Sequence, residues 1–160
     1  MKNKIHNINV IAKEKLPSPK ALKDTLPLTS KARKTVLSKR KELMSILDGN
    51  DSRLVVVVGP CSIHDTNLAK DYALRLKELS KELEDSFLIL MRVYFEKPRT
   101  TTGWKGLIND PNIDDTFQID KGIHIARSLL IDLNEMGLGV ATEALDPIMP
   151  QYLGDLTSWT

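Results

Sequence analysis

The first stretch of the chain lacks a repeating hydrophobic pattern. Residues 1–30 are mostly polar and are interrupted by Pro17, Pro19 and Pro27. Because proline removes a backbone donor and fixes φ, a long helix is disfavoured there. We therefore predict an extended amino-terminal arm over residues 1–30, with at most one helical turn.

A helical pattern begins directly after this arm. Apolar residues recur near helical spacing from Val36 to Leu47, which predicts a leading helix within residues 31–50. Ser30 is placed to cap its amino terminus, and Asp48-Gly49-Asn50 is typical of a helix end. After this triplet the period of the pattern changes.

Residues 51–160 alternate short apolar runs with amphipathic stretches. The runs at 54–58, 87–93 and 138–142 have the length and composition of buried parallel strands. Helical stripes follow the first two runs, the first capped by Asp65 or Thr66, and Pro150 begins a short last helix. Because each crossover between parallel strands needs a helix, the alternation predicts a parallel α/β fold.

The alternation does not separate an open doubly wound sheet from a barrel. A closed eight-stranded barrel takes about 250 residues, whereas this chain has 160 residues. About three strand–helix units are visible in residues 51–160. The chain is therefore either a small open sheet or the first part of a (β/α)8 barrel.

Composition narrows the functional classes. Lys plus Arg number 23 against 21 Asp plus Glu, a net charge of +2, which argues against a dedicated nucleic-acid-binding protein. A single cysteine, Cys61, fits a reducing compartment. Neither a signal peptide nor an apolar run long enough to span a bilayer is present, so we predict a cytoplasmic protein without membrane contact.

Candidate chemistry gathers where the predicted strands end, the place where both parallel architectures bind ligands. Cys61 follows the first strand behind Gly59-Pro60. It is either a metal ligand or a buried free cysteine, because one thiolate does not make a metal site. His64 is less favoured as a ligand, since it also fits a simple loop position.

The second strand end concentrates positive charge. Four cations fall within a short stretch: Arg92, Lys97, Arg99 and Lys105. Such a cluster is usually a solvated face. Arg92 interrupts an apolar strand, however, so its charge needs a partner or a pocket. The long loop that follows also carries hydroxyl and backbone donors, which favours a site for phosphate or carboxylate.

The third strand end carries Glu143. Its carboxylate is a candidate proton shuttle or a neighbour of a metal ligand. The alternative is an ion pair with Arg92 or Lys97. Asp146-Pro147 is typical of a turn.

Several contiguous motifs are more specific than any of these residues alone. They are GPCSIHD at 59–65, MRVYFEKPRTT at 91–101, GWKGLINDP at 103–111, ATEALDP at 141–147 and PQYLGDL at 150–156. In this order they resemble the type I 3-deoxy-D-arabino-heptulosonate-7-phosphate (DAHP) synthases, from about residue 30 to the end of the chain.

The resemblance implies a transferase on a (β/α)8 TIM barrel. Its reaction condenses phosphoenolpyruvate with erythrose 4-phosphate and water to give DAHP and phosphate, the first step of the shikimate pathway. A divalent metal ion (Mn, Fe, Zn or similar) is expected, with Cys61 as one ligand. The catalytic residues are expected to be Lys97 and Glu143.

The resemblance also implies substrate contacts. Arg92 and Lys97 are expected to bind phosphoenolpyruvate, and Lys97 also to act as an acid. Pro98, Arg99 and Thr100 are expected to hold erythrose 4-phosphate.

Finally, the resemblance implies feedback inhibition by an aromatic amino acid, with tyrosine favoured over phenylalanine. The matching positions are Asp146, Pro150 and Gln151. The family's other metal ligands fall beyond Thr160, so we expect a partial, truncated barrel that is inactive alone and a homo-oligomer at full length. The alternative is a non-catalytic remnant that only oligomerises or binds an effector.

Overall fold

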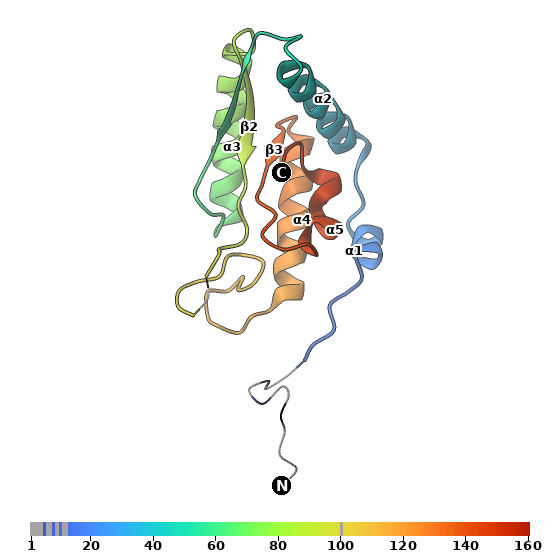
Figure 1. Cartoon of the computed structure of the whole chain (residues 1–160), viewed down its shortest axis with the longest axis vertical. Coiled ribbons are helices and arrows are strands. Elements are labelled where there is room, and N and C mark those ends of the chain that lie inside the picture. The colour runs from blue at the N-terminus through green and yellow to red at the C-terminus, as the bar shows by residue number, and fades with distance from the viewer. Residues whose placement is uncertain (1–4, 6–7, 9, 11–12, 100) are drawn as a thin grey trace.

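The computed structural model describes residues 5, 8, 10, 13–99 and 101–160 (Figure 1). Along the chain the elements are α1 (Pro19–Thr25), α2 (Ser30–Leu47), β1 (Leu54–Val58), α3 (Thr66–Glu82), β2 (Phe87–Arg92), α4 (Ile119–Glu135), β3 (Val140–Ala141), α5 (Met149–Leu153) and the 3₁₀ helix η1 (Gly154–Leu156). The predicted alternation of strands and helices is confirmed.

The three strands form one parallel sheet in the order β1-β2-β3. Leu54 pairs with Phe87 and Met91 pairs with Val140, so each strand lies beside its predecessor. On the free side of β3, Trp159 forms a further parallel bridge to Ala141. The strand order is therefore sequential, without the reversal that marks a doubly wound sheet.

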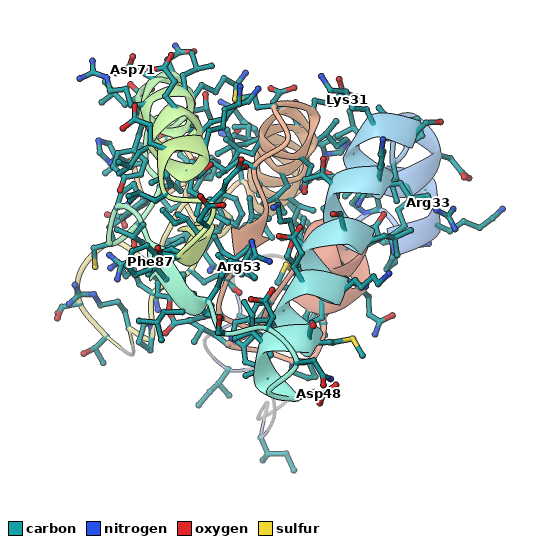
Figure 2. All side chains as sticks on the ribbon, turned by 90° about the horizontal axis from the view of Figure 1, so that it is seen from above. Lys31, Arg33, Asp48, Arg53, Asp71 and Phe87 are labelled. Carbon is teal, nitrogen blue, oxygen red and sulfur yellow. The ribbon has the colours of Figure 1, made fainter. Side chains whose placement is uncertain are left out.

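Helices cover both faces of β2. Ile89 and Met91 share one apolar cluster with side chains of α3 and α4, while Leu88 and Leu90 join Leu43 of α2 in a second cluster. This division follows from the period-two alternation of side chains along a strand. Seen from above, α3 and α2 lie on opposite sides of the molecule (Figure 2).

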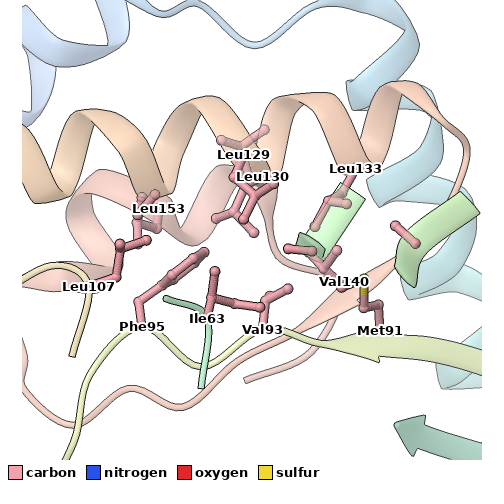
Figure 3. Close-up of a cluster of buried hydrophobic side chains, with 14 of the residues drawn as sticks. Ile63, Met91, Val93, Phe95, Leu107, Leu129, Leu130, Leu133, Val140 and Leu153 are labelled. Atoms are coloured by element: carbon pink, nitrogen blue, oxygen red, sulfur yellow. The ribbon is translucent and has the colours of Figure 1, made fainter. Parts of the chain in front are cut away.

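The larger cluster extends past the strand ends into the loops. Ile63, Phe95 and Leu107 are buried and point toward Leu129 and Leu130 of α4 (Figure 3). These contacts fix the turn after β1 and the loop after β2, which carry the candidate site residues, on the same packed core.

Two sequence predictions about the amino-terminal half are wrong. The arm holds a seven-residue helix rather than one turn at most, because Ser18 accepts a hydrogen bond from the Ala21 N–H and Pro19 begins the helix. Helix α2 is capped by Thr29 rather than Ser30, since the Thr29 hydroxyl accepts from the Ala32 N–H. For α3, Asp65 is the cap.

Strand burial and strand length also differ from the prediction. β1 was expected to be buried, yet Leu54 is 64% and Val57 41% exposed, because within the described part of the chain β1 pairs only with β2 and so lies at the sheet edge. The third strand spans two residues rather than five. Among the described residues, no helix is long and apolar enough to cross a membrane.

Candidate functional site

The Cys61 thiol and the Lys97 ammonium group meet at the carboxyl ends of β1 and β2. Lys97 Nζ donates to Cys61 Sγ over 3.2 Å. Cys61 is exposed, so its reading as a buried structural cysteine is wrong. The turn after β1 and the loop after β2 lie at the same end of the sheet (Figure 1). Residues far apart in the sequence thus meet where parallel folds bind ligands.

The turn that carries Cys61 is held tightly at both ends. A Cβ added to Gly59 would lie 2.5 Å from the carbonyl oxygen of Arg92, so the chain approaches too closely for any other residue. At the other end the Ile63 N–H donates to the Tyr94 carbonyl over 2.9 Å. Ile63 itself is 1% exposed. The thiol therefore projects from a short turn anchored to the segment after β2.

The guanidinium group of Arg92, which is partly buried, is hydrogen-bonded to two backbone carbonyl groups. Its Nε donates to the Pro60 carbonyl over 3.0 Å and its Nη2 donates to the Gly59 carbonyl over 2.7 Å. The guanidinium carbon lies 5.3 Å from the centre of the Tyr94 ring, a cation–π distance. The prediction that this charge needs a partner is confirmed.

The loop after β2 folds back on itself. The Lys97 N–H donates to the Lys105 carbonyl over 3.0 Å, and the Ile108 N–H donates to the Phe95 carbonyl over 3.2 Å. Pro98 and Arg99 in this loop are exposed. Thr100 lies outside the described residues. This folding places Lys97 over the Cys61 turn and presents Arg99 to solvent.

Glu143 is exposed after β3. Within the described residues, none of the ion pairs joins Glu143 to Arg92 or Lys97, so that alternative is wrong. Glu143 and Pro150 line a cavity of about 30 Å³.

Glu96 is a site residue that the sequence did not single out. Burial, followed by the nearby Asp146 carboxylate, raises the pKa of Glu96 above its ordinary value. The Asn109 amide also donates to Glu96 Oε1 over 3.4 Å. A carboxylate between Phe95 and Lys97 was the available signal, but only the fold brings it to Asp146.

The positions matched to an effector site cluster around α5. Asp146 Oδ1 accepts from the backbone N–H groups of Ile148 and Met149, over 2.5 and 2.9 Å. Gln151 is exposed on α5. The Tyr152 hydroxyl donates to the Pro17 carbonyl over 2.7 Å. The segment after β3 is thus tied to the amino-terminal arm.

A metal site requires several ligating side chains close together. No group of three or more His, Cys, Asp and Glu side chains suited to a metal occurs in the described part of the chain. Cys61 nevertheless offers an exposed sulfur on an anchored turn, a soft donor suited to Zn, Fe or similar ions. Cys61 therefore fits the role of one ligand in a larger set.

Comparisons with known proteins point to one family. The family described as the DAHP synthetase I family matches residues 25–160. The Phe-sensitive phospho-2-dehydro-3-deoxyheptonate aldolase of Escherichia coli K12 is 60% identical over 147 residues, 92% of this chain and 42% of that protein. The Tyr-sensitive enzyme of the same strain is 51% identical over 159 residues, 99% of this chain and 45% of that protein.

A solved structure agrees with these sequence relatives. The phospho-2-dehydro-3-deoxyheptonate aldolase of Francisella tularensis SCHU S4 has a TM-score of 0.91 and 51% identity to this chain. The match covers 94% of this chain and 44% of that chain. The chain therefore spans less than half the length of these three relatives.

Proposed function

The chain belongs to the DAHP synthetase I family, and from this premise we propose that it is part of an enzyme that condenses phosphoenolpyruvate with erythrose 4-phosphate and water to give DAHP and phosphate. The observation that supports this most is the pairing of Lys97 with Cys61 over 3.2 Å at two adjacent strand ends. An ammonium group beside a metal-ligating type of side chain suits a site for an anionic, metal-assisted reaction.

Two cations are assigned to phosphoenolpyruvate in this proposal. Arg92 and Lys97 both approach the Cys61 turn, so an anion placed between them is close to any metal on Cys61. A guanidinium group suits planar carboxylate or phosphate groups, and an ammonium group binds as a point charge. Lys97 also acts as an acid, and Glu143 is assigned proton transfer.

Erythrose 4-phosphate is assigned to the exposed part of the loop after β2. Pro98 and Arg99 are exposed there, where a second phosphate reaches them without displacing the buried core. Thr100 completes this part of the proposal. Two phosphorylated ligands then enter the same end of the sheet from neighbouring segments.

Cys61 is assigned as one ligand of a divalent metal ion, such as Mn, Fe or Zn. When bound, such an ion polarises the aldehyde carbonyl of the second substrate. The chain's own contribution is to hold the thiol on a turn anchored at Gly59 and Ile63. No group of three or more side chains suited to a metal occurs among the described residues, so Cys61 is assigned as one ligand of a larger set.

The proposed architecture is a (β/α)8 barrel, in which residues 1–30 form the arm, 31–50 the leading helix and 51–160 the first strand–helix units. The sequential order β1-β2-β3 supports it. So does the isolated parallel bridge from Ala141 to Trp159, which lies on the side of β3 away from β2. Homo-oligomer formation and a cytoplasmic location stay predictions from the sequence.

Feedback inhibition by an aromatic amino acid is proposed at Asp146, Pro150 and Gln151, next to the amino-terminal arm. The relatives include both Phe-sensitive and Tyr-sensitive enzymes. Identity is higher to the Phe-sensitive relative, 60% against 51%, so phenylalanine deserves equal weight with the tyrosine favoured from the motifs. The similarity to enzymes disfavours the alternative of a non-catalytic remnant.

A steady-state assay tests the proposed reaction. We expect the full-length protein to consume phosphoenolpyruvate only when erythrose 4-phosphate is present, with release of phosphate. Chelation of divalent metal should abolish the reaction and Mn²⁺ should restore it. Consumption of phosphoenolpyruvate without erythrose 4-phosphate, or activity that survives exhaustive chelation, would contradict the proposal. Adding tyrosine or phenylalanine to the same assay identifies the effector.

A further inference from the structure

Arg92 contacts the Cys61 turn through one edge of its guanidinium group. Nε and Nη2 donate to the carbonyls of Pro60 and Gly59, over 3.0 and 2.7 Å. These carbonyls belong to the two residues directly before Cys61. Rotation of either peptide would move the thiol, so the two hydrogen bonds fix where the sulfur lies.

The opposite edge of the same group is available for a ligand. A guanidinium group has five N–H donors in a rigid plane, and these two bonds use the Nε edge. Among the described residues, none of the hydrogen bonds of Arg92 involves Nη1. The Tyr94 ring, 5.3 Å away, restrains the orientation of the plane. Arg92 therefore holds the turn and presents donors to an anion at the same time.

The packing around the turn makes this arrangement rigid. Gly59 lies so close to the Arg92 backbone that an added Cβ would reach its carbonyl oxygen at 2.5 Å. The Ile63 N–H to Tyr94 carbonyl bond closes the other side of the turn. Lys97 adds a third contact, at Sγ itself. Backbone and side-chain contacts from the segment after β2 thus surround the residue that carries the thiol.

We infer that Arg92 is a positioning residue for Cys61 as well as a substrate contact, so that it sets metal affinity before any substrate binds. This inference rests on the proposed function in taking Cys61 as a metal ligand. A group that orients a ligand typically contributes about 10- to 100-fold to metal affinity. A residue that only binds substrate would leave the metal affinity of the substrate-free protein unchanged.

The test is a Co²⁺ titration of the substrate-free, full-length protein, followed by the thiolate-to-cobalt absorption. Arg92→Lys keeps the positive charge but loses the fork that spans two carbonyls. We expect its Co²⁺ affinity to fall at least about tenfold. Arg75→Lys is the matched control, because Arg75 lies on α3 with a largely exposed side chain and is assigned to no ligand; its Co²⁺ affinity should equal that of the unmodified protein.

Amide hydrogen exchange of residues 59–65 in the metal-free protein supplies an independent readout. A turn released from Arg92 should exchange the Ile63 amide faster, while the buried strand β2 keeps its protection and so reports an intact fold. If Arg92→Lys binds phosphoenolpyruvate poorly but keeps both Co²⁺ affinity and slow exchange, the positioning role is refuted and the proposed function stands. If the unmodified protein gives no thiolate–cobalt absorption, the metal role of Cys61 is refuted. Faster exchange in Arg92→Lys would then show only that Arg92 holds the turn in place through its two hydrogen bonds.

Discussion

At the scale of single residues, the buried Arg127 of α4 connects several separate segments of the chain. It is 0% exposed, and its guanidinium group donates to both carboxylate oxygens of Asp155, over 2.8 and 2.9 Å. It also donates to the carbonyls of Leu26 and Tyr152. One side chain of α4 thereby joins the segment before α2 to α5 and η1. A buried arginine is tolerated only when its donors are satisfied in this way.

This pair predicts a pH-dependent stability. Burial alone would raise the pKa of Asp155, but the hydrogen bonds and charge of Arg127 hold that pKa below its ordinary value of 3.8. For a carboxyl group with a lowered pKa, the stabilisation is present at neutral pH and is lost as the pH falls through the lowered pKa. Asp155→Asn should therefore lower the free energy of unfolding by about 3 kcal/mol at neutral pH.

Urea denaturation at neutral pH and at a pH well below 3.8 measures this effect. The difference between Asp155→Asn and the unmodified protein should shrink at the lower pH. Asp71→Asn is the control, because the ion pair of Asp71 with Arg75 is largely exposed and should contribute less than about 1 kcal/mol. Equal stability losses in the two variants would refute the assigned role of Asp155.

At the scale of elements, the packing of α2 on the sheet depends on a glycine in front of β3. A Cβ added to Gly139 would lie 2.7 Å from Lys39 Cγ and 2.8 Å from Leu90 Cδ2. Gly139→Ala should therefore cost about 1–3 kcal/mol through overpacking. Gly154→Ala is the matched control, since a Cβ there meets nothing within 4 Å. Thermal unfolding compares them; a loss of stability in Gly154→Ala alone would contradict this account.

Sequence patterns predicted where the helices and strands lie better than they predicted the burial of each strand or the capping residue of each helix. Apolar periodicity predicted α3, β2 and α4, because burial on a common core imposes that periodicity. The β-branched run of β1 could not reveal that this strand lies at an edge, since pairing partners are set by the whole sheet. Likewise Thr29 and Ser30 both carry hydroxyl groups, and residue type alone does not choose between them as the cap.

Site residues were predictable to the extent that their chemistry is local. Cys61, Arg92 and Lys97 stood out at predicted strand ends, and the structure brings all three together. Glu96 was missed, because its raised pKa arises from burial and from Asp146, which lies far away in the sequence. The two-carbonyl contact of Arg92 also depends on the close approach of Gly59, which no spacing reveals.

At the scale of the whole molecule, the location of the candidate site at the strand ends is consistent with the family to which the chain belongs. The sequential parallel sheet brings the turn after β1 and the segment after β2 to the same end (Figure 1). There Arg92 and Lys97 contact the turn that carries Cys61. The chain covers less than half of its three described relatives. The activity is therefore proposed for the full-length protein, with Cys61 proposed as one of several metal ligands.

DAHP formation by the full-length protein with Cys61 replaced tests the central claim most directly. Cys61→Ser in excess Mn²⁺ should lower the turnover rate at least about a hundredfold, because the thiolate ligand is lost. Ser62→Ala is the control within the same turn, since its buried hydroxyl has no hydrogen-bond partner among the described residues, and it should keep its activity. Undiminished turnover in Cys61→Ser, or a folded unmodified protein that forms no DAHP, would contradict the account.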